Sequence, residues 1–442
     1  MTRRPLDIAI VGAGWAGLAA AVHACQDGHH VTLFEAARTL GGRARALPST
    51  LPDGRPVMLD NGQHILIGAY TETLRLMRLV GLAPRDVLLD LPLTLQFPDG
   101  TGLHLPNWPT PLDALGGILG ARGWTWADKW SLIRAATRWQ RQGFTCEAGL
   151  SVAELCQTVS TRVTADVIEP LCVSALNTPV AQADAQVFLR VLRDALFGVA
   201  GGSHLLLPRT DLGTLFPAAA ADWVQQRGAQ LHLGTRVAQL APSGGNTWQV
   251  NGQSFDVVIL ANSAENAALA LTKSSSSAIE YIAKEMQAWV STVSALRFEA
   301  IATVYAWAPT SRLPQPMLAL RSNAAHPAQF VFDRGQLGGP QGLLAFVVSA
   351  SQSDRATLQA QVLQQAEDQL QLDLQAVQTI VEKRATFACV PHLLRPGSRI
   401  APGLLACGDY VAGPYPATLE GAVRSGVAAA VLANTDMMTD HA

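Results

Sequence analysis

The chain has 442 residues, of which 49% are hydrophobic and 15% are charged, and its formal net charge is −2. This length allows two or three structural units, and the near balance of charge excludes the basic stripe of a nucleic-acid-binding protein. The low fraction of charged residues and a mean hydropathy of +0.18 indicate an apolar ligand, an apolar surface, or both. Six scattered cysteines without a CxxC pair predict no disulfide framework and no metal site, which favours reduced thiols in a cytoplasmic protein.

The first segment predicts a strand, a glycine-rich turn and a helix. Residues 6–11 form a short apolar run, and residues 15–28 are rich in alanine. Between them stands Gly12-Ala13-Gly14-Trp15-Ala16-Gly17, a GxGxxG pattern. Gly12 permits a tight turn, Gly14 lets a pyrophosphate approach, and Gly17 lets the helix pack closely on the strand. The helix N-terminus then offers N–H groups and a positive dipole end to phosphates.

A second predicted strand, residues 30–34, ends at Glu35. A carboxylate at this distance from the glycines accepts a ribose hydroxyl in dinucleotide-binding proteins. The charge-free run 8–26 is also compatible with a signal peptide or a short anchor, but Asp7 before it and the glycines inside it oppose that interpretation. The order of strand, turn, helix, strand and acid therefore predicts a dinucleotide site.

The next motif, Leu40-Gly41-Gly42-Arg43-Ala44, resembles the signature of flavoproteins of the amine oxidase and carotenoid desaturase type. Two glycines let the backbone run close under a diphosphate, and Arg43 supplies a fixed cation. The alternative is an ordinary loop with a solvated arginine. After the GxGxxG pattern, the resemblance implies that the cofactor is FAD rather than NAD.

A second flavin motif lies near the C-terminus. Residues 403–407 predict a buried strand that leads into Gly408-Asp409, and Thr418-Leu419-Glu420-Gly421-Ala422 opens an alanine-rich helix. The resemblance implies that the Asp409 carboxylate binds the ribityl chain and that the helix directs its first N–H groups at the flavin N1/O2 edge, where reduction places negative charge. The alternative is a plain strand–turn–helix, with Asp409 as a turn residue and Thr418 as an N-cap.

The middle of the chain predicts further elements of both kinds. Residues 229–240 suggest two short strands, and residues 247–261 a hairpin around Asn251-Gly252 that feeds a buried strand. This block resembles the returning segment of the same FAD domain, in which the backbone of a residue such as Val237 contacts the adenine. Elsewhere we expect strands at 298–306 and 343–349, helices at 126–142 and 356–374, and a solvated loop at 273–277.

The predicted fold class is α/β, with a Rossmann-like FAD-binding domain of the glutathione-reductase and amine-oxidase type and an inserted α+β substrate domain. The FAD-binding domain is expected to comprise residues 1–75, 210–270 and 383–436, and the substrate domain residues 76–209 and 271–382. Within the latter, the tryptophan-rich segment 112–130 is a candidate membrane contact. Packing of these tryptophans inside the substrate domain is the alternative.

Two further motifs, Asp60-Asn61-Gly62-Gln63-His64 and the run from Gly413 to Gly426, resemble the hydroxysqualene dehydroxylase family, also called squalene-associated FAD-dependent desaturases. The resemblance implies reductive removal of the hydroxyl of hydroxysqualene, a C30 isoprenoid, to give squalene and oxidised flavin. Such a substrate accounts for the scarce charge and for peripheral membrane contact. Because no second nucleotide fingerprint is visible, an external electron donor is expected. The sequence does not give the oligomeric state.

The catalytic acid is not derivable from the sequence, and two residues are candidates. His64 is either a catalytic group that faces the flavin or a hydrogen-bonded structural histidine, and Tyr415 is either an aromatic wall or a proton donor. Asp60 is a cofactor-proximal cap or a turn residue, and Glu420 is a less attractive acid. The expected FAD contacts are Gly12, Gly14, Trp15, Ala16, Gly17, Glu35, Ala36, Gly42, Arg43, Ala44, Val237, Gly408, Asp409, Thr418 and Leu419.

Three other functions compete with this one. A carotenoid-type polyene desaturase or an amine oxidase would move the hydride from substrate to flavin. No cysteine lies at 409–421, where covalent flavin attachment often occurs in amine oxidases, which disfavours that class. A lipid-binding chaperone of the Rab GDP-dissociation-inhibitor type shares the fold without flavin, but the intact Glu35, Arg43 and Asp409 oppose it.

Overall fold

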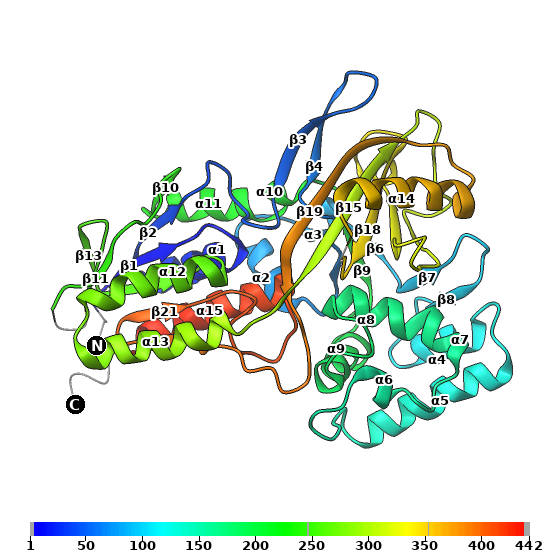
Figure 1. The fold of residues 1–442 in the computed structure, drawn as a ribbon, viewed down its shortest axis with the longest axis horizontal. Coiled ribbons are helices and arrows are strands. Elements are labelled where there is room, and N and C mark those ends of the chain that lie inside the picture. Colours follow the sequence, from blue (N-terminus) through cyan, green and yellow to red (C-terminus); the bar gives the residue numbers. More distant parts are fainter. Residues whose placement is uncertain (1–3, 245–246, 352, 437–442) are drawn as a thin grey trace.

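A six-stranded sheet organises the unit that contains the first and the last described elements (Figure 1). In the computed structural model, which describes residues 4–244, 247–351 and 353–436, five of its strands are parallel and the edge strand β20 is antiparallel. In spatial order the strands are β10 (Gln230–Leu233), β2 (His30–Glu35), β1 (Asp7–Val11), β14 (Val257–Leu260), β21 (Leu404–Ala406) and β20 (Arg399–Ala401).

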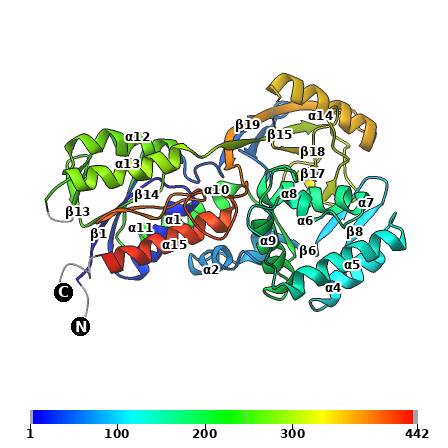
Figure 2. The same ribbon diagram turned by 60° about the horizontal axis from the view of Figure 1, so that its bottom comes forward.

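Both faces of this sheet are covered, which explains why its central strands β1, β14 and β21 are almost continuously apolar. Ile8 and Ile10 of β1 share one buried cluster with helices α1 and α15, whereas Ala9 and Val11 face a second cluster with β12 and α13. Figure 2 shows the resulting layers, with α12 and α13 on the side opposite α1 and α15. The covering elements are α1 (Trp15–Gln26), α10 (Leu212–Leu215), α11 (Pro217–Gln225), α15 (Leu419–Asp436), β11 (Leu240–Pro242), β12 (Trp248–Val250), β13 (Gln253–Phe255), α12 (Ala264–Ser274) and α13 (Glu280–Ser294).

The second unit is built on a five-stranded antiparallel sheet. Its spatial order is β16 (Met317–Ala319), β17 (Phe330–Asp333), β18 (Leu343–Ser349), β15 (Phe298–Trp307) and β19 (Gln375–Phe387). Helix α14 (Arg355–Leu370) packs on one face, and the other face looks toward a group of helices (Figures 1 and 2). These helices are α4 (Leu112–Gly120), α5 (Trp126–Arg141), α6 (Val152–Leu155), α7 (Thr161–Val163), the π-helical turn η1 (Thr164–Ile168), α8 (Glu169–Leu176) and α9 (Ala185–Phe197).

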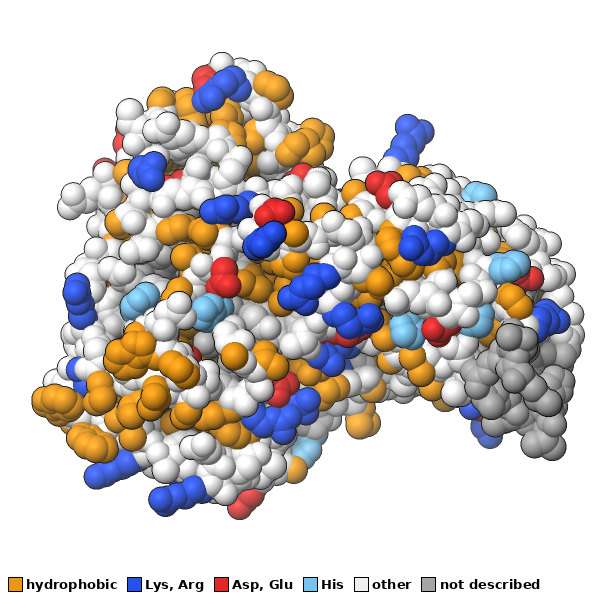
Figure 3. Space-filling model, turned by 180° about the vertical axis from the view of Figure 1, so that it is seen from behind, with side chains coloured by type: hydrophobic (Ala, Val, Ile, Leu, Met, Phe, Trp, Pro, Cys, Tyr) orange, Lys and Arg blue, Asp and Glu red, His pale blue; other side chains and the backbone are white. Residues whose placement is uncertain are grey.

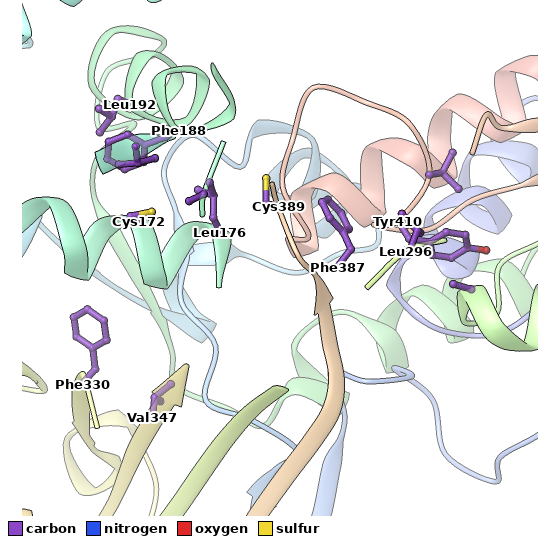
Figure 4. Packing of buried hydrophobic residues seen from close by; sticks show 14 of the residues in the cluster. Cys172, Leu176, Phe188, Leu192, Leu296, Phe330, Val347, Phe387, Cys389 and Tyr410 are labelled. Atoms are coloured by element: carbon purple, nitrogen blue, oxygen red, sulfur yellow. The ribbon is translucent and has the colours of Figure 1, made fainter. Parts of the chain in front are cut away.

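Smaller elements connect the two units, and buried apolar side chains continue between them. Phe387 at the end of β19 and the nearby Cys389 lie between Tyr410 of the first unit and Leu176 of the second (Figure 4). The remaining elements are β3 (Ala46–Thr50), β4 (Pro56–Asp60), β5 (Leu66–Ile67), α2 (Thr71–Leu79), α3 (Pro84–Val87), β6 (Leu88–Leu91), β7 (Thr94–Gln96), β8 (Gly102–His104), β9 (Leu205–Pro208), the 3₁₀ turn η2 (Ser275–Ser277) between α12 and α13, and the 3₁₀ turn η3 (Arg334–Leu337) between β17 and β18.

The predicted α/β class and the predicted N-terminal strand, turn, helix and strand are confirmed by β1, α1 and β2. The hairpin is confirmed as well: Asn251 and Gly252 have φ values of 49° and 85°, as a type I′ turn requires. Strands β15 and β18 and helix α5 also lie where the sequence predicts them.

One prediction of local structure is wrong, and two others are correct in kind but differ in their bounds. Residues 273–277 are the end of α12 and the turn η2 rather than a solvated loop. Only one strand, β10, lies within residues 229–239, and β11 starts at Leu240. Helix α14 stops at Leu370 because Gln371 adopts a left-handed conformation.

The predicted division into two domains stays a prediction, and the packing departs from it at two places. Helix α13 packs on β20 of the first unit, although the sequence assigns residues 271–382 to the substrate domain. Strand β19, which the sequence analysis missed, runs across the expected boundary at residue 383.

Candidate functional site

The carboxyl ends of four parallel strands meet at one edge of the six-stranded sheet. Strand β1 leads into Gly12, β2 ends at Glu35, β14 is followed by Asn262, and β21 is followed by Gly408. Ligands of open parallel sheets bind at this edge, because the loops that leave the strands converge there. The two flavin motifs, which lie about 365 residues apart, are thereby brought to one place.

Glycines at this edge allow backbone contacts that a side chain would prevent. Gly12 has a φ of +119°, and a Cβ there would lie 2.7 Å from the carbonyl oxygen of Ala261. A Cβ on Gly17 would lie 1.9 Å from the carbonyl oxygen of Gly12, so α1 could not approach the turn. These contacts support the roles that the GxGxxG spacing predicts for Gly12 and Gly17.

The two N-terminal glycine motifs contact each other directly. The Gly41 N–H donates to the Ala13 carbonyl at 2.9 Å, and a Cβ on Gly42 would lie 3.2 Å from the Cα of Gly14. The Trp15 indole N–H donates to the Ala44 carbonyl at 3.3 Å. Backbone of both motifs therefore lines one cradle beside the N-terminus of α1, whose free N–H groups attract a diphosphate.

Glu35 is fixed at the end of β2 by two backbone donors. Its Oε2 accepts from the N–H of Ala13 at 2.8 Å, and its Oε1 accepts from the N–H of Ala37 at 2.8 Å, with Ala36 between them in the chain. Each carboxylate oxygen retains a lone pair for another donor. This arrangement fits the predicted ribose hydroxyl.

Arg43 and Asp409 join the N-terminal and C-terminal flavin motifs. Arg43 Nη2 donates to Asp409 Oδ1 at 2.5 Å, and the Asp409 side chain is 9% exposed. Arg43 also donates to the carbonyl of Ala385 in β19. The Asn61 amide of the DNGQH motif donates to the Arg43 carbonyl at 3.0 Å, so three distant segments orient this arginine.

Several polar groups at this edge are positioned to take a ligand. Among the described residues, Asn262 Oδ1 and the Tyr410 hydroxyl are buried without a hydrogen-bond partner. Burial also raises the pKa of Tyr410, which keeps its hydroxyl a donor. Unpaired buried polar groups are costly, and a ligand rich in hydroxyls and phosphates would satisfy them. The residues present thus fit FAD.

The predicted adenine contact at Val237 lies in the extended segment between β10 and β11. The Asn251 side chain accepts from the N–H of Ala238 at 2.9 Å and donates to the Arg236 carbonyl at 3.2 Å, and so holds the segment on both sides. No hydrogen bond among the described residues uses the backbone N–H or carbonyl of Val237. The geometry is compatible with adenine contact, which stays a prediction.

Thr418 caps the start of α15, as the alternative interpretation of this motif expects, while its predicted contact with FAD stays a prediction. Thr418 Oγ1 accepts from the N–H of Gly421 at 3.1 Å, while Gly408 N–H donates to Ser425 one turn further along the helix. Leu419 is the first residue of α15. The helix N-terminus therefore lies beside the Gly408-Asp409 turn, where its N–H groups and dipole favour negative charge.

Glu420 caps a different helix. Its buried carboxylate accepts from the N–H groups of Glu72 at 3.0 Å and Thr73 at 2.9 Å at the start of α2, and from Arg424 Nε at 2.6 Å. These donors occupy the carboxylate, so a structural role accounts for this residue.

His64 lies close to the cofactor motifs and is held by its own loop. Its Nδ1 is 2.8 Å from the carbonyl of Gly62, which makes Nδ1 the protonated nitrogen and Nε2 an acceptor. Burial lowers the pKa of His64, and the charge of Arg43 acts in the same direction. The neutral imidazole is thus the favoured form.

Tyr415 lies between two arginines from different helices. The guanidinium carbon of Arg190 in α9 lies 5.4 Å from the ring centroid, and that of Arg424 in α15 lies 5.2 Å from it. Arg395, which the sequence analysis missed, donates to the Tyr415 carbonyl at 2.6 Å and to the Val411 carbonyl. No spacing along the chain links these residues, because they come from separate elements.

Asp60 is not a turn residue, and its place as a cap near the cofactor stays a prediction. It ends strand β4, is 2% exposed, and accepts from the N–H of Leu212 at 2.8 Å at the start of α10. Its Oδ2 lies 3.6 Å from Arg334 Nη2. Burial raises the pKa of Asp60 to about 6, although Arg334 acts against this shift.

A glycine cradle, a carboxylate at the end of the second strand and a helix N-terminus at one edge of a parallel sheet are typical of dinucleotide-binding oxidoreductases. The chain belongs to the family of flavin-containing amine oxidoreductases, whose profile matches residues 15–434. It is an enzyme whose cofactor is FAD, as the two flavin motifs predict. No helix within the described residues has the length and apolar character to cross a membrane.

Relatives of known name match nearly the whole chain. It is 24% identical to hydroxysqualene dehydroxylase of Zymomonas mobilis, over 96% of this chain and 98% of that protein, and 26% identical to that of Rhodopseudomonas palustris, over 96% and 97%. This confirms the predicted family resemblance. Zeta-carotene desaturase of Arabidopsis thaliana is 32% identical over only 22% of this chain and 16% of that protein. An oxidoreductase structure from Methanosarcina mazei shares the fold, with a TM-score of 0.70, 16% identity, and coverage of 97% of this chain and 100% of that chain.

Proposed function

We propose that the chain removes the hydroxyl of hydroxysqualene reductively and releases squalene. The observation that carries the proposal is similarity along the whole length to proteins named hydroxysqualene dehydroxylase, whereas the carotene desaturase match covers about a fifth of the chain. A C30 isoprenoid also agrees with the low charge of the sequence.

The reaction breaks the C–O bond, releases the oxygen with a proton as water, and forms a C–H bond with a hydride. Reduced FAD, when bound, supplies that hydride. An allylic carbon spreads the positive charge that develops as the hydroxyl departs, and water must be kept away from it. Buried apolar side chains of α8, α9 and β17, among them Leu176, Phe188 and Phe330, pack in the second unit (Figure 4), and in this proposal they keep water from the substrate.

The departing hydroxyl needs a proton, and His64 and Tyr415 remain the candidates. Neutral His64 with its proton on Nδ1 presents an acceptor at Nε2, so its geometry favours binding the substrate hydroxyl over protonating it. Tyr415, in the loop that precedes α15, has a hydroxyl that can donate a proton, and its ring lies against Arg190. We therefore assign the proton to Tyr415 and the orientation of the substrate hydroxyl to His64.

The test is an anaerobic single turnover of the purified full-length holoenzyme. The flavin is reduced with dithionite, which makes the result independent of the proposed external electron donor, and hydroxysqualene is added in detergent. We expect reoxidation of the flavin with one squalene formed per flavin. A flavin that stays reduced contradicts the proposal, and reduction of the oxidised enzyme by a polyene instead would establish the desaturase reaction.

The same assay separates the two side chains. Loss of one catalytic proton donor typically slows a reaction by about 10²–10⁴-fold. We expect Tyr415→Phe to slow reoxidation by this amount and His64→Phe to slow it less. Equal rates in Tyr415→Phe and the unmodified enzyme would remove Tyr415 from the mechanism. Flavin content measured before each reaction shows whether a variant has lost its cofactor.

A further inference from the structure

Six large apolar side chains are exposed together on α4, α5 and the loop before α4. We call them the α4–α5 apolar surface: Trp108, Leu112, Leu115, Leu119, Trp126 and Trp130, with exposed fractions from 41% to 66%. In the view from behind, they gather at the lower left of the molecule (Figure 3). Scattered single apolar residues are normal on a protein surface, but a contiguous group marks a contact site.

The helical spacing shows that this exposure is not a by-product of core packing. Leu112, Leu115 and Leu119 follow an i, i+3, i+7 pattern along the outer face of α4, and Trp126 and Trp130 are one turn apart on α5. The face of α5 that packs inside carries Leu132, Ala135 and Trp139 instead. Helix α5 therefore has two apolar faces, only one of which serves the fold.

The protruding side chains are held in place by their surroundings. Gly116 leaves room for Trp108, since a Cβ there would lie 2.5 Å from the indole ring. Lys129 Nζ lies 5.1 Å from the Trp126 ring centroid and donates to the Leu119 carbonyl at 2.6 Å. The surface is thus an ordered feature of the two helices.

Positive charge surrounds the apolar surface. Residues 105–142 contain five basic and two acidic side chains, a net charge of +3 in a chain whose total is −2. Both acids are engaged: Asp113 is buried, and Asp128 forms a capping box with Thr125. Beyond Trp130 on α5, a depression in the surface is lined by Arg134, Arg138 and Arg141.

We propose that the α4–α5 apolar surface docks on an anionic lipid bilayer. Tryptophan and leucine side chains insert at the level of the lipid headgroups, and the arginines of α5 contact lipid phosphates. Charge argues against a second copy of this chain as the occupant, because a symmetric contact would bring two positive surfaces together. The proposal does not depend on the proposed function, since it is tested by lipid binding rather than turnover.

The experiment is co-sedimentation of the full-length holoenzyme with vesicles. One set contains phosphatidylcholine alone, and the other contains equal amounts of phosphatidylcholine and phosphatidylglycerol. We expect binding to the mixed vesicles to be about a hundredfold stronger, since Arg134, Arg138 and Arg141 each gain from lying near an anionic surface. The double change Trp126→Ser and Trp130→Ser should weaken binding to both sets by about tenfold or more. Arg134→Glu with Arg141→Glu should abolish the preference for the mixed vesicles.

Matched controls distinguish binding through the α4–α5 apolar surface from nonspecific binding through any exposed apolar or charged residue. Leu269→Ser with Ile279→Ser changes residues of similar exposure, 54% and 68%, on the first unit and should leave binding unchanged. Arg85→Glu reverses the charge of a side chain that is 90% exposed and lies on α3, outside the α4–α5 apolar surface. This variant should keep the lipid preference. Equal binding by the tryptophan variant and the unmodified protein overturns the proposal. A lipid-free dimer that the tryptophan variant disrupts, seen by analytical ultracentrifugation, would assign the surface to a second copy instead.

Discussion

The ion pair of Arg43 and Asp409 is the shortest link between the two flavin motifs. Its oxygen and nitrogen are 2.5 Å apart, and Asp409 is largely withdrawn from solvent. A partly buried carboxylate of this kind makes strong charge-assisted hydrogen bonds and orients its partner. The pair therefore fixes Arg43 against the glycine cradle before any cofactor binds.

We expect Asp409→Ala to weaken FAD retention while the fold persists. A hydrogen bond to a charged group contributes about 1.5–3 kcal/mol, which corresponds to a rise of about ten- to a hundredfold in the dissociation constant of FAD. The measurement is titration of apoprotein with FAD, supported by circular dichroism. Asp354→Ala, which removes an exposed N-cap of α14, serves as the control and should retain FAD. An Asp409→Ala protein that purifies fully yellow contradicts the predicted role.

Residues that act through the local chain could be predicted from the sequence, and residues that act through distant partners could not. Glu35 follows the glycines at a spacing set by one strand–helix–strand unit, so its place at the site was foreseeable. Arg395 donates to the backbone carbonyls of Val411 and Tyr415, because the loop that carries Arg395 packs against their loop in the folded chain. The orientation of His64 likewise depends on the carbonyl of Gly62, which no sequence pattern reveals.

Helices α1 and α15 form the closest helix pair around the cofactor edge. A Cβ on Gly426 of α15 would lie 2.1 Å from the Ala16 carbonyl of α1. The N-terminus of α1 faces the predicted position of the diphosphate and that of α15 the predicted position of the flavin, so this glycine contact sets the spacing between the two helices.

Gly426→Ala should destabilise the protein even though alanine is the better helix former. Alanine gains about 1 kcal/mol in helix propensity, but forcing a methyl group into a backbone contact costs about 1–3 kcal/mol and moves one helix. We expect a lower melting temperature and weaker FAD binding, measured by thermal unfolding with and without FAD. Gly120→Ala in α4 is the control, because nothing lies within 4 Å of its added Cβ. Equal effects of the two substitutions would contradict this account.

The sequence predicts elements that have a clear hydrophobic pattern of their own. It does not predict elements that form only because a distant segment pairs with them. Residues 7–35 form an apolar strand, a glycine turn and an alanine-rich helix, each with its own local signal. The serines that end α12 were expected in a loop, but Ser274 Oγ donates to the Ala270 carbonyl at 2.8 Å and remains helical. Strand β19 mixes charged and apolar residues and forms because β15 pairs with it.

At the scale of the whole molecule, a buried polar network joins the sheet of the second unit to the segment that leads from the cofactor cradle. Asp60 at the end of β4 pairs with Arg334, and its backbone carbonyl accepts from the hydroxyl of Tyr305 in β15 at 3.0 Å. Arg334 Nη1 also donates to Gln63 at 3.1 Å, next to His64. The DNGQH motif is therefore a joint between the two units.

Ionisation of Asp60 should make the stability of this joint depend on pH. Its pKa is about 6 in the folded protein against an ordinary value of 3.8, because burial penalises the charged form. Below about pH 4 the folded and unfolded chains both hold the proton, and the contribution to stability is fully present. Between about pH 4 and 6 the unfolded chain ionises first, so the contribution falls, by roughly 3 kcal/mol in all.

Comparison of unfolding free energies for the unmodified protein and Asp60→Asn across this range isolates the effect, since asparagine does not titrate. The stability of the unmodified protein relative to the variant should decrease as the pH rises from about 4 to 6. Arg334 counteracts the shift by attracting the carboxylate, and Asp211 reinforces it. Arg334→Met should therefore extend the loss to higher pH. A stability difference that stays constant between about pH 4 and 7 would show that Asp60 is ionised throughout and that the joint is a permanent ion pair.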